Sequence, residues 1–218
     1  NQTEAVSDTL HVALHNDATS SHTSGWQYFP VTLPTGLNID DHLSSKSVAV
    51  NASGQLFVAL KLHGGSGTDP EIGMIARDTD GTFSFHKYST TADRDTRPIL
   101  VLDEDANKVY IFVVGKPGGS QICYKSLDLP AAGQLDTMGD FDAGDCGLSF
   151  IEDKTNFYNS INNPTSMKGN ANATTGIVVL ASDDDDATGK YYFHNVMGDP
   201  PPVVDVVVPI RSGIDVPV

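Results

Sequence analysis

The feature that most constrains the fold is an internal repeat. A short apolar segment recurs four times along the 218 residues, and the central residues of its copies follow one another at spacings of 46, 53 and 67 residues. The copies are centred on Val12, Val58, Ile111 and Val178. A recurrence at roughly 40–50 residues is typical of chains that build one small unit several times and stack the copies.

Each apolar segment belongs to a longer unit of short strands. A candidate strand and a turn precede three of the copies, within residues 47–55, 98–108 and 165–176. A further strand is predicted after each copy, at 26–33, 72–77, 121–129 and 190–197. A fourth strand is clear only at 82–88, where Phe83 and Phe85 alternate with polar residues. The four predicted strands of one unit therefore form an antiparallel meander.

Composition agrees with many strands and few helices. Of the 28 acidic residues, 24 are Asp and four are Glu. Asp prefers turns and caps, whereas Glu favours helices. With 20 Gly and 12 Pro in addition, the sequence predicts an all-β fold, a β-propeller or propeller fragment of about four antiparallel blades, with a β-sandwich as the alternative.

The two ends of the chain are out of step with the repeat. The first copy begins at its second strand, and the C-terminal residues are rich in Pro and Val. We expect a propeller-like repeat domain at residues 1–199 and a linker or closing strand at residues 200–218. Either that tail closes the ring or, as we favour, the chain is part of a larger propeller with further domains in the same parent chain.

The net charge of -15 excludes several classes of partner. Only 13 Lys and Arg are present, without a basic cluster, so the chain repels nucleic acid and anionic lipid. No apolar stretch approaches the roughly 18 residues of a spanning helix, so membrane insertion is not expected. Abundant Asp and scarce Lys favour an extracellular or cell-surface location.

Two of the repeat units resemble a known family. The segments SVAVNASGQLFVALKL and RPILVLDEDANKVYIFVVG are similar to blades of the sialidase-like, BNR-repeat propeller superfamily of secreted carbohydrate-associated proteins. The family's Asp-box turn, Ser-x-Asp-x-Gly-x-Thr-Trp, is not matched, and the nearest segment, at 78–83, has the wrong distance from Asp to Gly. A sialidase also needs three convergent arginines and a Tyr–Glu pair, which the four arginines and the tyrosines here do not reproduce. The resemblance therefore implies a fold and a setting, without implying sialidase activity.

Cysteine and histidine positions give further expectations. Cys123 and Cys146 are predicted to form a disulfide worth on the order of 3 kcal/mol, with two buried free thiols as the alternative. His11 and His86 alternate with apolar residues and are predicted to face outward from their sheets. No Gly-x-Ser-x-Gly, GxGxxG, Walker or HExxH motif is present.

Two acidic runs are candidate cation sites. The first comprises Asp183, Asp184, Asp185 and Asp186, and the second comprises Asp136, Asp140, Asp142 and Asp145. Carboxylates in loops suit Ca²⁺, which prefers six to eight oxygen ligands. Solvated acidic turns are the alternative interpretation, because neither run has EF-hand spacing.

A ligand-binding rim is predicted from the repeat alignment. Loops that lead into the innermost strands and loops that leave the second strands should meet at one end of a propeller. The predicted ligand-binding residues at this rim are Lys46, His63, Arg94, Arg97 and Lys116. Arg and Lys suit carboxylate or sulfate groups, so an acidic glycan is the expected ligand. The alternative is that Arg97 pairs with a neighbouring Asp and only ties adjacent blades.

We therefore expect a non-catalytic extracellular binding or adhesion module of a larger protein, which recognises glycan or protein. The alternatives are a polysaccharide-active hydrolase or lyase with its site at the propeller mouth, and a purely structural repeat of an adhesin or filament. Fold and composition support the first reading partly by analogy.

Overall fold

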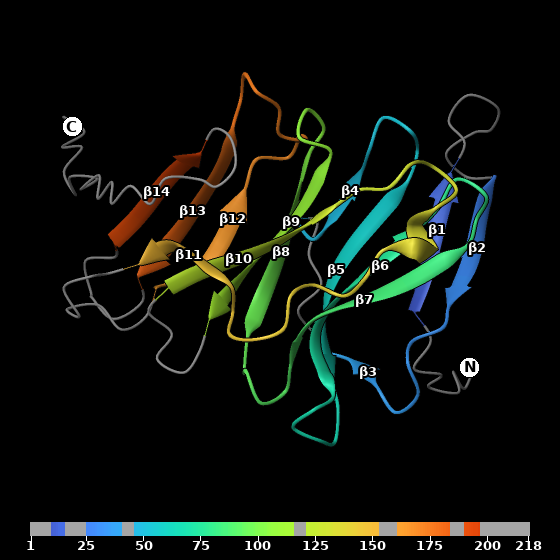
Figure 1. Cartoon of the computed structure of the whole chain (residues 1–218), viewed down its shortest axis with the longest axis horizontal. Helices are drawn as coiled ribbons and strands as arrows, with labels where there is room; N and C mark the ends of the chain where they lie inside the picture. Colours follow the sequence, from blue (N-terminus) through green and yellow to red (C-terminus); the bar gives the residue numbers. More distant parts are fainter. Residues whose placement is uncertain are drawn as a thin grey trace, which may run out of the picture.

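The computed structural model describes residues 10–15, 25–40, 46–115, 121–152, 161–183 and 190–196. In these residues the protein is all-β, and its antiparallel sheets follow one another along the chain (Figure 1). No helix in this part of the chain is long and apolar enough to cross a membrane. Residues 200–218, the predicted linker or closing strand, lie outside the described residues.

The first two sheets differ in size. Sheet 1 is the antiparallel pair of β1 (Leu10–His15) and β2 (Trp26–Val31). In sheet 2, three long strands form a meander and two short strands share one edge of it. These strands are β3 (Asn38–Ile39), β4 (Val48–Val50), β5 (Leu56–His63), β6 (Pro70–Arg77) and β7 (Phe83–Thr90). Both β3 and β4 pair with β5, at its end and its beginning respectively.

The third and fourth sheets repeat the meander. Sheet 3 contains β8 (Thr96–Asp103), β9 (Lys108–Gly115), β10 (Gln121–Asp128) and β11 (Leu148–Glu152). A long loop with a short 3-10 turn, η1 (Leu135–Thr137), separates β10 from β11. Sheet 4 contains β12 (Ile161–Ser166), β13 (Ile177–Asp183) and β14 (Lys190–Val196).

The predicted repeat unit corresponds closely to these strands. The four apolar segments are β1, β5, β9 and β13, and each is followed by the predicted third strand. The third unit also has a fourth strand, β11, which the sequence pattern did not reveal. β12 begins at Ile161, earlier than expected. Its pairing with β13 is interrupted at Asn163 and Pro164, and this interruption concealed the start of the strand in the sequence pattern.

The residue alignment within the repeat was wrong by one position in two copies. Val58 and Ile111 both face the preceding sheet, as the alignment required. Val12 faces sheet 2 instead, which follows it, and Val178 points away from sheet 3, because its neighbours Ile177 and Val179 are the buried ones. Side chains alternate along a strand, so a shift of one residue transfers a side chain to the opposite face.

The core lies between consecutive sheets. One cluster joins sheets 1 and 2, a second joins sheets 2 and 3, and a third joins sheets 3 and 4. On β9, Ile111 faces sheet 2 and Phe112 faces sheet 4, and both are 0% exposed. Phe112 meets Phe150 of β11 edge-on, with 4.8 Å between ring centroids. Sheets 2 and 3 are therefore buried on both faces, which accounts for their nearly continuous apolar strands.

The first strands of sheets 2, 3 and 4 lie close to one another. The Leu100 amide on β8 donates to the Lys46 carbonyl just before β4, with 2.8 Å between the atoms. The Ala171 amide after β12 donates to the Leu102 carbonyl of β8 at 2.6 Å. Successive sheets are thus joined along one edge as well as through their faces.

The β10–β11 loop, residues 129–147, packs over β7 of sheet 2, and we refer to it as the clasp loop. The Phe141 amide donates to the Lys87 carbonyl at 2.9 Å, and the Lys87 amide donates to Asp140 Oδ1 at 2.7 Å. His86, predicted to face solvent, is 2% exposed because this loop covers it. Its ring contacts the Gly139 carbonyl and the Ser84 hydroxyl. His11, in contrast, is exposed as predicted.

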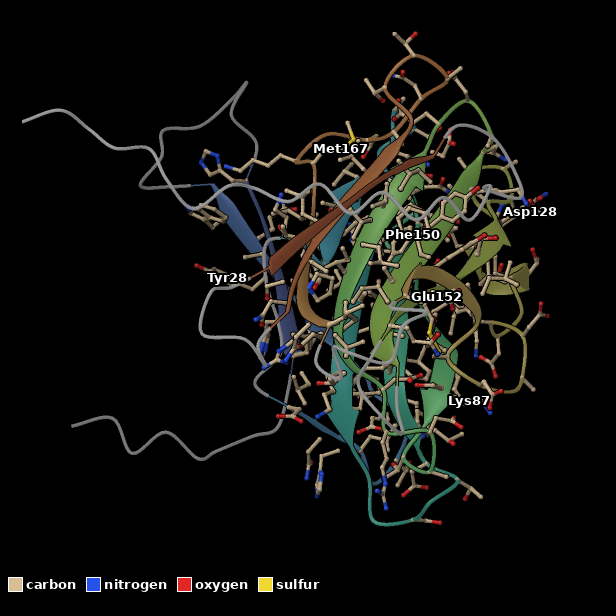
Figure 2. All side chains as sticks on the ribbon, turned by 90° about the vertical axis from the view of Figure 1, so that its left-hand side faces the viewer. Tyr28, Lys87, Asp128, Phe150, Glu152 and Met167 are labelled. Carbon is tan, nitrogen blue, oxygen red and sulfur yellow. A yellow bond between two sulfur atoms is a disulfide. The ribbon has the colours of Figure 1, made fainter. Side chains whose placement is uncertain are left out.

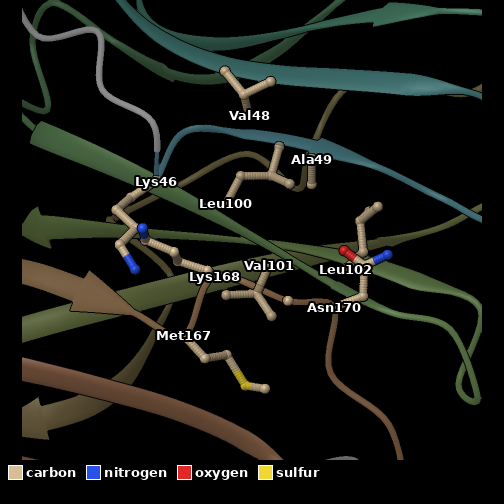
Figure 3. A pocket seen from close by; sticks show the side chains of 10 residues that line it. Lys46, Val48, Ala49, Leu100, Val101, Leu102, Met167, Lys168 and Asn170 are labelled. Carbon is tan, nitrogen blue, oxygen red and sulfur yellow. The ribbon is translucent and has the colours of Figure 1, made fainter. Parts of the chain in front are cut away.

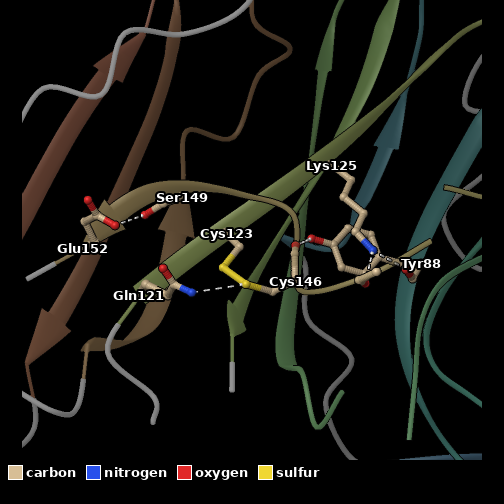
Figure 4. The surroundings of a disulfide bond; sticks show 8 residues. Tyr88, Gln121, Cys123, Lys125, Cys146, Ser149 and Glu152 are labelled. Atoms are coloured by element: carbon tan, nitrogen blue, oxygen red, sulfur yellow. Dashed lines mark hydrogen bonds between the residues drawn. A yellow bond between two sulfur atoms is a disulfide. The ribbon is translucent and has the colours of Figure 1, made fainter. Parts of the chain in front are cut away.

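The predicted disulfide is present and anchors the end of this loop. Cys123 on β10 and Cys146 are bonded, with 5.6 Å between their Cα atoms (Figure 4). Gly115 of β9 makes room for the bond, since a Cβ there would lie 2.7 Å from the Cys123 sulfur and 2.5 Å from the Cys146 sulfur. The alternative of two free thiols is therefore wrong.

In the described part of the chain, no strand pairing and no core cluster joins sheet 1 to sheet 4. Each of these sheets has an outer face. Trp26 and Tyr28 of β2 are 47% and 67% exposed, and Leu180 of β13 is 41% exposed. Figure 2 shows Tyr28 at the margin of the molecule and Phe150 among the side chains of its middle.

Candidate functional site

Strand register places the loop into the first strand and the loop out of the second strand at the same end of each sheet, for the residues that the structure describes. β8 begins where β9 ends, with Thr96 opposite Val114, and β12 begins where β13 ends, with Ile161 opposite Asp183. The approach to β4 lies at the same end, since the Ala59 amide donates to the carbonyl of Ser47. The loops that enter the first strands and leave the second strands therefore share an end.

Lys46 lies where the first strands of three sheets meet. Its carbonyl accepts from Leu100 of β8, and its ammonium donates to the carbonyl of Ser166 on β12. The next side chain, Ser47, is fully buried and donates to the Pro98 carbonyl at 2.7 Å. Lys46 is thus held by backbone atoms of the two sheets that follow it.

Arg97 ties sheet 3 to sheet 4. Its guanidinium donates to the Asn162 side-chain oxygen of β12, and its backbone lies in the left-handed region with a φ of 52°. The pairing of β8 with β9 is interrupted at this position, between Thr96 and Ile99. The partner is an Asn, not the Asp that the alternative interpretation expected, but the contact does join adjacent sheets.

A narrow groove runs along these first strands (Figure 3). Its lining comprises Lys46, Val48, Ala49, Leu100, Val101, Leu102, Met167, Lys168, Gly169 and Asn170. The side chains of Lys46 and Lys168 come together toward one end, and Asn170 lies toward the other. No carboxylate is among the lining residues, although the chain carries 28 acidic residues. The Asn170 side-chain amide donates to Glu104 Oε1 at 2.9 Å, so the cationic end of the groove is the end at Lys46 and Lys168. The groove admits little more than one water-sized group.

The other predicted rim residues do not line this groove. His63 is exposed at the end of β5, opposite Asn38 of β3. Arg94 is exposed in the loop between β7 and β8, with a φ of 58°. Lys116 lies outside the described residues.

The predicted cation sites are only partly described. Asp183 ends β13, and Asp184, Asp185 and Asp186 lie outside the described residues. Within the described part, no group of three or more His, Cys, Asp or Glu side chains is arranged to hold a metal ion. In the second acidic run, Asp140 binds a backbone amide of β7 and so has a structural role.

Asp78 is a structural centre that the sequence did not reveal. Its carboxylate accepts from the amides of Thr79, Gly133 and Leu135 at 2.7, 2.8 and 2.9 Å. Burial acts to raise the pKa of Asp78, but these backbone donors and Gln55 outweigh it and hold the pKa well below its usual value. Asp78 therefore anchors the clasp loop to sheet 2 as an ionised group.

Asp95 presents the opposite situation. Its side chain is 0% exposed, and neither carboxyl oxygen has a hydrogen-bond partner. Burial raises the pKa of Asp95 to about 7; Ser89 and Lys125 oppose this effect, whereas Asp93 and Glu71 add to it. The nearby Ser89 hydroxyl also lacks a hydrogen bond of normal geometry. A wholly buried carboxyl without a partner is unusual and requires an explanation.

Lys125 lies beside Tyr88 and the segment that leads to Cys146 (Figure 4), and it interacts electrostatically with Asp95. It is 8% exposed, and its ammonium donates to the carbonyls of Tyr88 and Gly144 at 2.9 and 3.2 Å. Burial lowers the pKa of Lys125, and Asp95 is the main group that opposes this shift. The Tyr88 hydroxyl in turn donates to the Cys146 carbonyl at 2.5 Å. These contacts link β7, β10 and the disulfide.

Sequence reasoning missed Lys168 and Lys125, and it placed Asp95 in the rim loop beside Arg94 without predicting its burial. Lys168 was overlooked because it follows an irregular strand whose start was placed too late. Asp95 and Lys125 lie in segments predicted as a loop and a strand, and neither pattern signals burial. Only the packing of two sheets against each other buries them.

Comparison with protein families, with curated proteins and with solved structures finds no match for this chain. The resemblance to sialidase-like propellers consequently stays a prediction from the sequence pattern. Function has to be argued from the site itself.

Proposed function

We propose that this protein is a non-catalytic binding module that recognises an acidic glycan through the groove at Lys46 and Lys168. The observation that carries the proposal is the convergence of two lysines at one end of a groove, away from the Glu104 carboxylate that binds Asn170 at the other end. In a chain with a net charge of -15, two neighbouring ammonium groups favour an anionic partner. A sulfate or carboxylate of a glycan fits this chemistry, and it would bind at the mouth of the groove beside the two ammonium groups, because the groove itself admits little more than a water-sized group.

The proposed architecture is a β-propeller or a fragment of one. Four sequential antiparallel sheets packed face to face, with the first strands of sheets 2, 3 and 4 adjacent, support this proposal. In such an arrangement the groove would border the central axis, where propellers commonly form ligand sites. A sandwich remains the competing architecture, and a complete set of sheet orientations would distinguish the two.

An extracellular or cell-surface location is part of the proposal. The Cys123–Cys146 disulfide supports it, because disulfides persist mainly in oxidising compartments. Ca²⁺ at Asp183–Asp186 is a separate proposal, which calcium titration of the whole chain would test.

Calorimetric titration with a sulfated hexasaccharide and with its desulfated counterpart tests glycan binding. We expect the sulfated form to bind, with an affinity that falls as salt rises. Lys168→Ala should weaken binding about tenfold or more, since a hydrogen bond to a charged group contributes about 1.5–3 kcal/mol. Lys168 is the preferred site because Lys46 also binds the Ser166 carbonyl.

Lys108→Ala is the matched control. Lys108 is paired with Asp128 at 3.1 Å and is not among the residues that line the groove, so its loss should leave binding unchanged. Equal affinity in folded Lys168→Ala and wild type, or no binding of the sulfated probe, would remove the proposal. Shortened oligosaccharides after incubation would favour the alternative of a polysaccharide-active enzyme.

A further inference from the structure

The loop between β7 and β8, residues 91–95, carries the chain from sheet 2 to sheet 3. The backbone amides of its first two residues are hydrogen-bonded: Thr91 and Ala92 donate to the carbonyls of Asp69 and Gly67 at 2.9 and 3.0 Å. Asp93 accepts from the amide and hydroxyl of Thr90, both at 2.8 Å. We refer to residues 91–95 as the crossover.

The end of the crossover is poorly satisfied. Asp95 is wholly buried and both its carboxyl oxygens lack partners. On either side of it, Arg94 and Arg97 have φ values of 58° and 52°. A left-handed backbone conformation is unfavourable for a residue other than Gly. Strained backbone and an orphaned carboxyl therefore coincide at one point between two sheets.

The charged and titratable groups around Asp95 come from every neighbouring element. Glu71 lies on β6, Tyr88 on β7, Asp93 in the crossover and Lys125 on β10. Two of these are acids that repel a second negative charge. Lys125 is the one cation among them, and it directs its ammonium to two backbone carbonyls without forming an ion pair with Asp95. An ionised Asp95 would therefore be buried with only the Ser89 hydroxyl and the distant charge of Lys125 to offset it.

We propose that the crossover is a proton-dependent switch, packed between sheets 2 and 3 while Asp95 is neutral and released when Asp95 loses its proton to solvent. Burial of an unpaired carboxylate is far more costly than burial of a carboxylic acid. The ionised group escapes that cost by moving toward water, and the strain at Arg94 and Arg97 favours the same movement.

The switch operates near neutral pH and acts on the rim. Burial raises the pKa of Asp95 to about 7. Release of Asp95 would move the exposed Arg94, and it would disturb Arg97, whose guanidinium holds Asn162 of sheet 4. The inference is independent of the proposed glycan, because it concerns the conformation of the unliganded protein.

Hydrogen exchange measured by mass spectrometry tests the switch. Protection factors, which correct for the intrinsic effect of pH on exchange, are compared at pH 6 and pH 8 for peptides that cover residues 90–97. We expect protection in the wild type to fall about tenfold, because the neutral fraction of a group with a pKa near 7 falls from about nine-tenths to one-tenth. Peptides from β9 should show unchanged protection.

Asp95→Asn mimics the neutral carboxyl and should keep the crossover protected at both pH values. Asp128→Asn removes an exposed carboxylate, 83% accessible, and should behave as the wild type. The same fall in Asp95→Asn as in the wild type would overturn the proposal. Constant protection in the wild type would overturn it too, whether or not the Asp95→Asn protein folds.

Discussion

Sheet 3 lies between two other sheets, whereas sheet 1 lies at one end of the row. The strands that carry the repeated apolar segment in these two sheets, β9 and β1, differ accordingly. On β9, the residues that face sheet 2 are Val109, Ile111 and Val113, and those that face sheet 4 are Tyr110, Phe112 and Val114; all are 3% exposed or less. On β1, Val12 packs against sheet 2, whereas the opposite face carries His11, Ala13 and His15. The repeat therefore predicts where a strand forms. Whether one or both faces of that strand carry apolar side chains depends on whether one or two sheets pack against it.

The two ends of the row are also unlike each other. On the outer face of sheet 4, β13 presents Val178 and Leu180, which continue the aliphatic pattern of the inner sheets. On the outer face of sheet 1, Tyr28 and Trp26 stand beside imidazoles; the rings of Trp26 and His15 are 4.9 Å apart. The outer face of sheet 1 therefore departs from the packing pattern that the other sheets share.

The largest effect should come from the middle of the row. Phe112→Ala removes a 0% exposed ring that contacts Phe150 and Tyr124. We expect a loss of about 3–5 kcal/mol in the free energy of unfolding, as for other buried aromatic truncations. Leu180→Ala, at the 41% exposed end position, should cost less than about 1 kcal/mol. Urea denaturation of both variants measures the difference, and equal losses would contradict the comparison.

Loss of the Asp78 carboxylate, which holds the clasp loop to sheet 2, should lower the free energy of unfolding by a smaller amount that depends on pH. Asp78 has a pKa lowered below its unfolded value of 3.8, so its contribution is fully present above pH 4 and is lost as pH falls further. Asp78→Asn should destabilise the protein by at least about 2 kcal/mol at pH 7, and the difference from the wild type should shrink toward pH 2. Denaturation midpoints between pH 2 and 7 would show this convergence.

The control for this variant is Asp128→Asn. The Asp128 carboxylate is 83% exposed and pairs with Lys108 on the surface, so its removal should change stability by less than about 0.5 kcal/mol at either pH. A constant deficit of Asp78→Asn across the whole range would show that its hydrogen bonds matter irrespective of ionisation.

Local pattern was sufficient to predict most of the strands and the disulfide, because each rests on short-range alternation or on a single pair of cysteines. It failed where the deciding contact is distant in sequence. His86 is buried by a loop some fifty residues later, through the Gly139 carbonyl. β11 was missed because it follows the clasp loop and pairs with only part of β10.

The candidate site was harder to predict than the fold. Register along neighbouring strands predicted Lys46 and Arg97 as ligand-binding residues of one rim; in the structure both side chains bind atoms of sheet 4. Lys168 joins Lys46 only because β12 lies beside β8 and β4. Asp95 is buried by the meeting of two sheets, which no periodicity in its own loop records.

The smallest effect is expected on the outer face of sheet 1. Ala13 lies opposite Tyr28, in an exposed position of β1. Ala13→Glu should change the free energy of unfolding by less than about 0.5 kcal/mol, because the new carboxylate stays in water. Val58→Glu, on the corresponding face of β5, is the matched variant. Val58 is 6% exposed between sheets 1 and 2, and an unpaired carboxylate there should prevent stable folding.

Trp26 is the single tryptophan and lies in the neighbouring strand, so its fluorescence reports on this sheet during denaturation. An Ala13→Glu protein as unstable as Val58→Glu would mean that the outer face of sheet 1 is packed like the inner faces.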